Sequence, residues 1–174
     1  MDIPTLLMVD EMASNKRQMV THTQSVRSEV WLSRMDEVRS DRLKNSWAAA
    51  QEHGDRFGHD FYQNLFLAQP GVAALFPGDM NAQEQRLTST LGEAVKLTSN
   101  PQQLLLLLRA AGVRHHHYQV EPAHFLVMQD ALIKTLSECL GEKKFASVEA
   151  DWRAFFSHMA SVMCHSMAGA GRRF

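Results

Sequence analysis

Several residue types that would mark a secreted, membrane-embedded or nucleic-acid-binding protein are scarce in this chain. It has two cysteines in 174 residues, and its 18 basic and 19 acidic side chains leave a net charge of −1. A chain without a basic excess has no electrostatic footprint for nucleic acid. Cys139 and Cys164 lie in apolar helical patterns without the spacing of a zinc site, so we expect two reduced, buried thiols.

Long hydrophobic runs are also missing. No stretch reaches the roughly eighteen apolar residues that a membrane span needs. Residues 1–11 hold a four-residue apolar run with no positive charge before it, which is unlike a secretory signal. We therefore expect a soluble, cytoplasmic protein that binds neither a membrane nor nucleic acid.

The two-residue alternation of β-strands is absent, whereas apolar residues recur at helical spacing along most of the chain. This pattern predicts an all-α protein. We expect residues 1–38 to form an N-terminal extension, partly helical or disordered, residues 39–168 one domain, and residues 169–174 a C-terminal tail. Glycine, proline and asparagine divide the domain into predicted helices over about 36–53, 55–69, 82–98, 101–117, 121–140 and 146–167.

Two of these helices carry patterns that predict how they pack. The first should bury one face, which comprises Val38, Leu43, Trp47 and Ala50. The helix that begins at Pro101 contains Leu104–Leu108, five consecutive leucines that would be apolar on every side. We therefore expect that helix to be covered nearly all round.

The leucine-rich helix closes with His115–His117, shortly before Pro122 opens the next apolar helix. Short helices with proline breaks, followed by two long amphipathic helices, favour a cofactor held between helices near these histidines. For His116 and His117 the alternative is a solvated helix end, where the helix dipole favours histidine. A metal site built from the triplet and His124 is disfavoured, because adjacent side chains point in different directions around a helix.

A series of motifs points to one family of proteins. The motifs are Phe61–Phe66, Pro70, Leu75–Pro77, Arg114–His115, Tyr118, Val120 and Phe125. In order and spacing they closely resemble the single-domain bacterial globins, the haemoglobin-like relatives of flavohaemoglobin globin domains. The resemblance covers about residues 38–168 and implies a three-over-three helical sandwich with haem b (iron protoporphyrin IX) as cofactor.

The resemblance also implies roles for individual residues around the haem. His115 matches the proximal iron ligand, and one axial imidazole leaves the sixth iron site open for a gas. Whether a distal side chain occupies that sixth site at rest stays open. The positions that resemble haem contacts are Phe76, which would stack on the haem face, Leu87, which would lie above the iron, Tyr118, Val120 and Phe125.

On the distal side, Tyr62 matches a tyrosine whose hydroxyl donates a hydrogen bond to bound oxygen, and Gln83 matches the distal glutamine. Tyr62 has an alternative as an ordinary core residue with its hydroxyl at the rim. The loop before Gln83 is shorter than in some relatives, so Gln85 or Arg86 could take its place. Arg86 is expected in the distal pocket or at a haem propionate, with a solvated surface position as the alternative.

Two departures from the flavohaemoglobin pattern bear on chemistry. The resemblance implies a tyrosine and a glutamate that hydrogen-bond the proximal histidine, but this chain has Phe125 and Met167 there. Neither can do so, hence His115 should behave more like an oxygen-carrier ligand than a peroxidase-like one. The chain also lacks the GxGxxG motif of dinucleotide-binding domains, so redox turnover would need a separate reductase.

The function that the resemblance implies is reversible binding of O2, and of CO and NO, at a His115-ligated haem. NO dioxygenation with an external reductase is a further hypothesis for this pocket. Two other classes stay open: a haem-based gas or redox sensor that uses residues 1–38 for docking or dimerisation, and a haem-free globin-fold signalling module. A homodimer is also left open.

Overall fold

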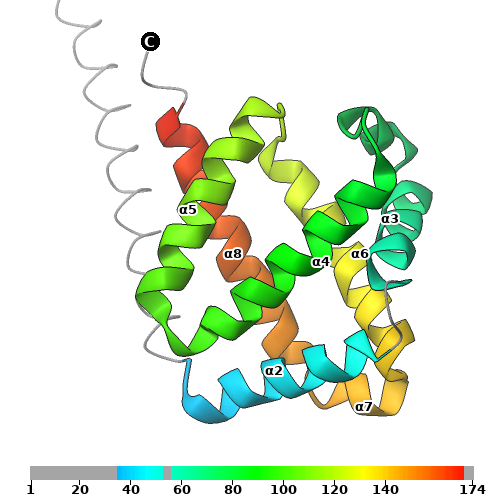
Figure 1. Cartoon of the computed structure of the whole chain (residues 1–174), viewed down its shortest axis with the longest axis vertical. Coiled ribbons are helices and arrows are strands. Elements are labelled where there is room, and N and C mark those ends of the chain that lie inside the picture. The colour runs from blue at the N-terminus through cyan, green and yellow to red at the C-terminus, as the bar shows by residue number, and fades with distance from the viewer. Residues whose placement is uncertain (1–34, 53–55, 171–174) are drawn as a thin grey trace, which may run out of the picture. The chain divides into compact units, whose positions relative to one another are not determined.

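The computed structural model describes residues 35–52 and 56–170. The expectations for residues 1–34, for a helix stop at Gly54 and for residues 171–174 lie outside this part of the chain. All the elements in the described ranges are helical, as predicted (Figure 1). They are α2 (Glu37–Gln51), α3 (Arg56–Ala68), the 3-10 helix η1 (Pro70–Leu75), α4 (Met80–Lys96), the 3-10 helix η2 (Leu97–Ser99), α5 (Pro101–His117), α6 (Pro122–Leu140), α7 (Glu142–Ala146) and α8 (Glu149–Ala170).

The helices pack in pairs that leave room for a site between them. α5 packs along α8, and α3 packs along both α6 and α4. In Figure 1, α4 runs diagonally across the view, in front of α8 and α6. None of the helices in the described ranges is long and apolar enough to cross a membrane.

Helix ends follow the local signals that the sequence carries. The Asn100 side chain accepts a hydrogen bond from the Gln103 backbone N–H at 3.3 Å, and Pro101 opens α5. Pro122 opens α6, and Gly141 ends it with φ of 76°, a left-handed conformation that favours glycine. The predicted bounds at these positions are confirmed.

The core behind the site is aromatic and is pinned by one indole hydrogen bond. Trp152 is fully buried and donates from Nε1 to the Ser46 hydroxyl at 3.0 Å, which ties α8 to α2. Trp47 packs edge-on against Phe57 with ring centroids 4.9 Å apart. These contacts join the second half of α2 to the first turns of α3 and α8.

Two packing predictions were wrong. Val38 is 62% exposed, because it lies five residues before Leu43 and thus about 140° around the helix from the buried face. Leu106 is 66% exposed, and of the five leucines only Leu104 and Leu108 are buried. α5 is covered mainly by α8, so its run of leucines faces a neighbour on one side instead of all round.

Candidate functional site

His115 lies in the last turn of α5 with its ring orientation set by the backbone. Its Nδ1 is 2.8 Å from the Ala111 carbonyl oxygen, so Nδ1–H donates and Nε2 keeps its lone pair. Burial lowers the pKa of His115, the Ala111 hydrogen bond opposes this, and the Arg114 charge adds to the lowering. The imidazole is therefore neutral at neutral pH, which is the form that binds a metal.

An almost wholly apolar cavity of about 130 Å³ opens beside this imidazole. A single imidazole in an apolar wall suits a flat, apolar cofactor that brings its own metal, because a bare cation needs several polar ligands. In the described ranges no three His, Cys, Asp or Glu side chains gather to hold such a cation. The cavity is lined by Leu87, Thr90, Leu91, Ala94, Leu107, Leu108, Ala111, His115, Phe125, Met128, Gln129, Leu132, Phe156, Met159, Ala160 and Met163.

A glycine brings α5 close enough to α8 to set the position of His115. A Cβ on Gly112 would lie 2.5 Å from the Met163 carbonyl oxygen, so only glycine permits this backbone approach. Phe125 from α6 stacks on the His115 ring, with centroids 5.8 Å apart and planes at 29°. The ring is therefore held between a backbone carbonyl and an aromatic face, with no carboxylate partner among these contacts.

Tyr62 on α3 belongs to an aromatic cluster outside the lining of the apolar cavity. It is 4% exposed, and its ring centroid lies 4.9 Å from that of Phe61, 5.7 Å from Phe66 and 5.1 Å from Phe76. Burial raises the pKa of Tyr62 to about 12, against the opposing effects of Gln83 and Arg86. The hydroxyl therefore stays protonated and can donate a hydrogen bond.

Arg86 and Gln83 determine which way that hydroxyl can point. Arg86 donates from Nε at 3.2 Å and from Nη2 at 2.7 Å to Gln83 Oε1. Because a guanidinium group only donates, the accepting atom is the Gln83 amide oxygen. Gln83 also interacts with the Tyr62 hydroxyl and lowers its pKa, which is the effect of an amide nitrogen that donates to the phenol oxygen. A Tyr62 oxygen that accepts from the amide nitrogen keeps its own O–H for another acceptor.

The structure gathers the predicted residues into two groups. His115, Phe125 and Leu87 line the apolar cavity, whereas Tyr62, Phe76, Gln83 and Arg86 form the polar and aromatic group. The second group does not line the cavity, but Gln83 lies one helical turn from Leu87 on α4. Two predicted haem contacts lie apart from both groups, since Tyr118 is 62% exposed and neither it nor Val120 lines the cavity.

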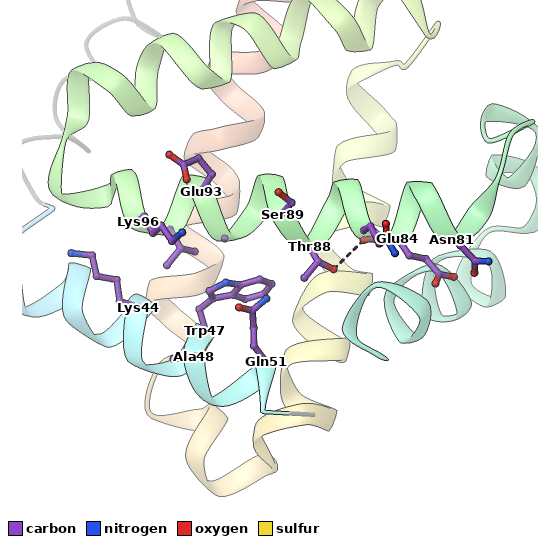
Figure 2. Close-up of a pocket in the computed structure, with 13 residues that line it drawn as sticks. Lys44, Trp47, Ala48, Gln51, Asn81, Glu84, Thr88, Ser89, Glu93 and Lys96 are labelled. Carbon is purple, nitrogen blue, oxygen red and sulfur yellow. Dashed lines mark hydrogen bonds between the residues drawn. The ribbon is translucent and has the colours of Figure 1, made fainter. Parts of the chain in front are cut away.

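A larger hollow, of about 800 Å³, lies between α2 and α4 (Figure 2). Its lining mixes charged, amide and hydroxyl groups with the Trp47 ring, and it contains neither His115 nor Leu87. Gln85 faces this hollow, while Gln83 faces Tyr62. Of the two glutamines, Gln83 is therefore the one that lies at Tyr62.

The remaining histidines near α5 do not join the site. His116 and His117 are exposed, with ring centroids 6.0 Å apart. His124 accepts a hydrogen bond from the Glu121 backbone N–H at 3.0 Å and so caps α6. His116 and His117 therefore have the exposed position at a helix end that was their alternative, and the capping role of His124 was not predicted.

Sequence reasoning did not single out several of the residues that line the cavity. Met128, Met159 and Met163 carry the signal of an inward helix face, which does not distinguish a packed core from a cofactor wall. Ala111 stood out in no pattern, although it lies one turn before His115 on the same face. The four-residue spacing between Ala111 and His115 was the sequence signal that could have identified Ala111.

Comparison with known proteins identifies the family. A globin family model matches residues 59–163, which is more than half of the chain. The chain belongs to the globin family. Goose haemoglobin subunits alpha-D are similar to it: that of Anser anser anser is 25% identical over 129 residues, 70% of this chain and 90% of the relative. That of Anser indicus is 25% identical over 125 residues, 67% of this chain and 87% of the relative.

A solved bacterial structure has the same fold. It is an engineered carbene transferase, described as a candidate nitric oxide dioxygenase from Rhodothermus marinus. The TM-score is 0.69 at 20% sequence identity, and the match covers 78% of this chain and 95% of that chain. The predicted all-α globin fold and the resemblance to bacterial globins are thus confirmed. Membership of the family implies haem binding, and the neutral imidazole in an apolar wall fits that cofactor.

Proposed function

We propose that this globin binds haem b through His115 and reversibly binds O2, as well as CO and NO, on the opposite haem face. One observation carries the proposal: the His115 Nε2 lone pair is free at an apolar cavity, while Nδ1–H is taken by the Ala111 carbonyl. Haem would supply the iron at which a gas binds. Everything else in the site is supplied by the side chains of this chain.

On the proximal side, the contacts of His115 favour a carrier over a peroxidase-like centre. A carbonyl oxygen polarises an imidazole less than a carboxylate does, so Nε2 is the weaker electron donor. The Ala111 bond and the Phe125 stack fix the ring plane. His115 would therefore be ready to coordinate without reorientation.

On the distal side, Tyr62 would stabilise a gas ligand that gathers negative charge. Its hydroxyl is buried and protonated, and Gln83 donates to its oxygen, so the O–H is left for the ligand. Arg86 holds the Gln83 amide in that orientation. This arrangement favours retention of O2 over the less polar CO.

The proposal has further parts, which concern NO, location and assembly. Consumption of NO with a separate reductase is supported by the Tyr62–Gln83 pair and by the Rhodothermus marinus protein described as a candidate nitric oxide dioxygenase. If the O2-bound protein failed to consume NO stoichiometrically, this activity would be dropped. A cytoplasmic location, residues 1–38 as an extension of a 39–168 globin domain, and a homodimer remain proposals.

The absorption spectrum of the protein reconstituted with haem tests the central claim. Wild type, His115→Ala and the exposed control His117→Ala are compared in ferric, ferrous and CO-bound forms. We expect stoichiometric haem uptake and a CO-dependent Soret shift in wild type and His117→Ala, and loss or alteration of both in His115→Ala. Absence of haem uptake by wild type would contradict the proposal and favour the haem-free signalling module.

A further inference from the structure

α3 and α4 approach each other closely next to the residues predicted for the distal side. A Cβ on Gly58 would lie 2.7 Å from the Glu84 carbonyl oxygen and 2.8 Å from the Glu84 Cβ, so only glycine fits at this crossing. Gly58 is one helical turn before Tyr62, and Glu84 directly follows Gln83. The distance between Tyr62 and Gln83 therefore depends on this contact between the two helices.

One side-chain pair, His59 on α3 and Glu84 on α4, joins the two helices at this crossing. His59 Nδ1 lies 3.2 Å from Glu84 Oε1, and His59 Nε2 lies 2.9 Å from the Gln63 amide nitrogen. Gln63 donates to Nε2 in this arrangement, so the ring is neutral and its Nδ1–H donates to Glu84. Figure 2 shows Glu84 at the α3 end of α4, where Thr88 Oγ1 bonds the Glu84 carbonyl oxygen at 3.0 Å.

Resting on the proposed gas binding, we infer that His59 and Glu84 are a positioning pair for the distal site, and that protonation of His59 slows release of O2. An imidazolium attracts the Glu84 carboxylate more strongly than a neutral ring does, so it holds α4, and Gln83 with it, more firmly against α3 at this contact. The Gln63 amide needs only to turn over to accept from the new Nε2–H.

The charge of Glu84 also affects the pKa of the Tyr62 hydroxyl. Its negative charge contributes to the raised pKa of Tyr62, whereas Arg86 acts in the opposite direction. An imidazolium next to Glu84 offsets part of that negative field and makes the hydroxyl a stronger donor. The stronger His59–Glu84 contact and the weaker negative field at Tyr62 should therefore both slow O2 release as the pH falls.

The other ionisable groups around this contact do not explain a change between pH 6 and 8. Arg56 and Asp60 pair with each other on α3 at 3.8 Å, and Arg86 on α4 and Glu138 on α6 bond Gln83 and Asn64. Carboxylates and guanidinium groups do not titrate in this range, whereas imidazole does. Burial raises the pKa of Cys139 on α6, so its thiol stays protonated, and η1 carries no ionisable side chain.

The rate of O2 dissociation, followed by displacement with CO between pH 6 and pH 8, tests the pair. Wild type is expected to release O2 about threefold more slowly at pH 6 than at pH 8, as suits a partly exposed ion pair. His59→Gln and Glu84→Gln should lose this dependence, and His59→Lys should keep the slow rate throughout. The exposed His165→Gln, on α8, is the control that should retain the wild-type profile.

A second readout does not require gas binding. In heteronuclear NMR of the protein as purified, with or without haem, the Gln83 side-chain amide signals should follow the His59 titration in wild type and not in Glu84→Gln. Wild type without haem uptake would refute the proposed function but leave this readout intact. An unchanged rate profile in both His59→Gln and Glu84→Gln, or Gln83 signals that ignore pH, would overturn the positioning role.

Discussion

Tyr62 shows how the environment of one hydroxyl group selects its chemistry. Burial keeps it protonated, with a pKa of about 12, and three aromatic rings fix its position. A hydrogen bond donated by the Gln83 amide, which would lower the Tyr62 pKa as Gln83 does, would occupy the phenol oxygen and leave its proton for a ligand. Whether this hydroxyl can donate to a ligand therefore depends on its burial and on which of its atoms already take part in hydrogen bonds.

Replacement of Tyr62 by phenylalanine should speed O2 dissociation about tenfold, since one hydrogen bond of typical strength is lost. The ring contacts with Phe61, Phe66 and Phe76 are kept, so the fold should not change. Stopped-flow O2 and CO dissociation measure the effect, and CO, a weaker hydrogen-bond acceptor, serves as the internal control. Equal acceleration of O2 and CO release would show a packing effect instead.

At the scale of elements, two glycine contacts set the frame of the site. Gly58 lets α3 touch α4 at Glu84, and Gly112 lets α5 touch α8 at Met163. Each contact lies about one turn from a candidate site residue, Tyr62 in the first case and His115 in the second. Displacement of either helix would move a ligand-binding group without altering it chemically.

Gly112→Ala should lower the free energy of unfolding by about 2 kcal/mol, because its Cβ would overlap the Met163 carbonyl oxygen, which is backbone and cannot turn away. Haem should also be lost faster to an acceptor such as apomyoglobin, as His115 moves with α5. Urea denaturation and the haem-transfer rate measure the two effects. Gly169→Ala, which adds a Cβ with nothing within 4 Å, is the matched control and should be neutral or stabilising.

For the whole molecule, a second buried imidazole links stability to pH. His158 on α8 is 5% exposed, and burial lowers its pKa to about 4. An unfolded chain carries this group with an ordinary pKa near 6.5, so below that pH the unfolded state binds a proton that the folded state does not. The free energy of unfolding therefore falls as the pH falls from 6.5 towards 4.

Between pH 7.5 and pH 5, His158 alone should remove about 2 kcal/mol from the free energy of unfolding. Over this pH interval, His158→Leu should lose about 2 kcal/mol less of its free energy of unfolding than wild type does. Urea denaturation of both proteins in the same haem state measures the difference. His165→Gln, which replaces an exposed histidine on the same helix, should follow wild type. Parallel pH profiles for wild type and His158→Leu would contradict the assignment.

Much of the fold could be predicted because its signals are local. Asn100 and Pro101 start α5, and Gly141 ends α6, through contacts within one turn of the chain. Burial was predicted less well, since the pattern around Leu106 shows that a face is apolar but not that a neighbour covers it. The candidate His115 followed from motif order, and its Ala111 bond was not predicted.

By itself, the sequence determined an all-α chain, the places where its helices begin and end, and its membership of the globin family. These properties depend on periodicity, capping and motif order, which lie along the chain. Only the tertiary structure decided which polar atoms meet, such as Arg86 with Gln83 oxygen and His59 with Glu84. Such contacts depend on side-chain rotamers and on how closely the helices cross, and the close approach at Gly58 appears only when α3 and α4 are packed together.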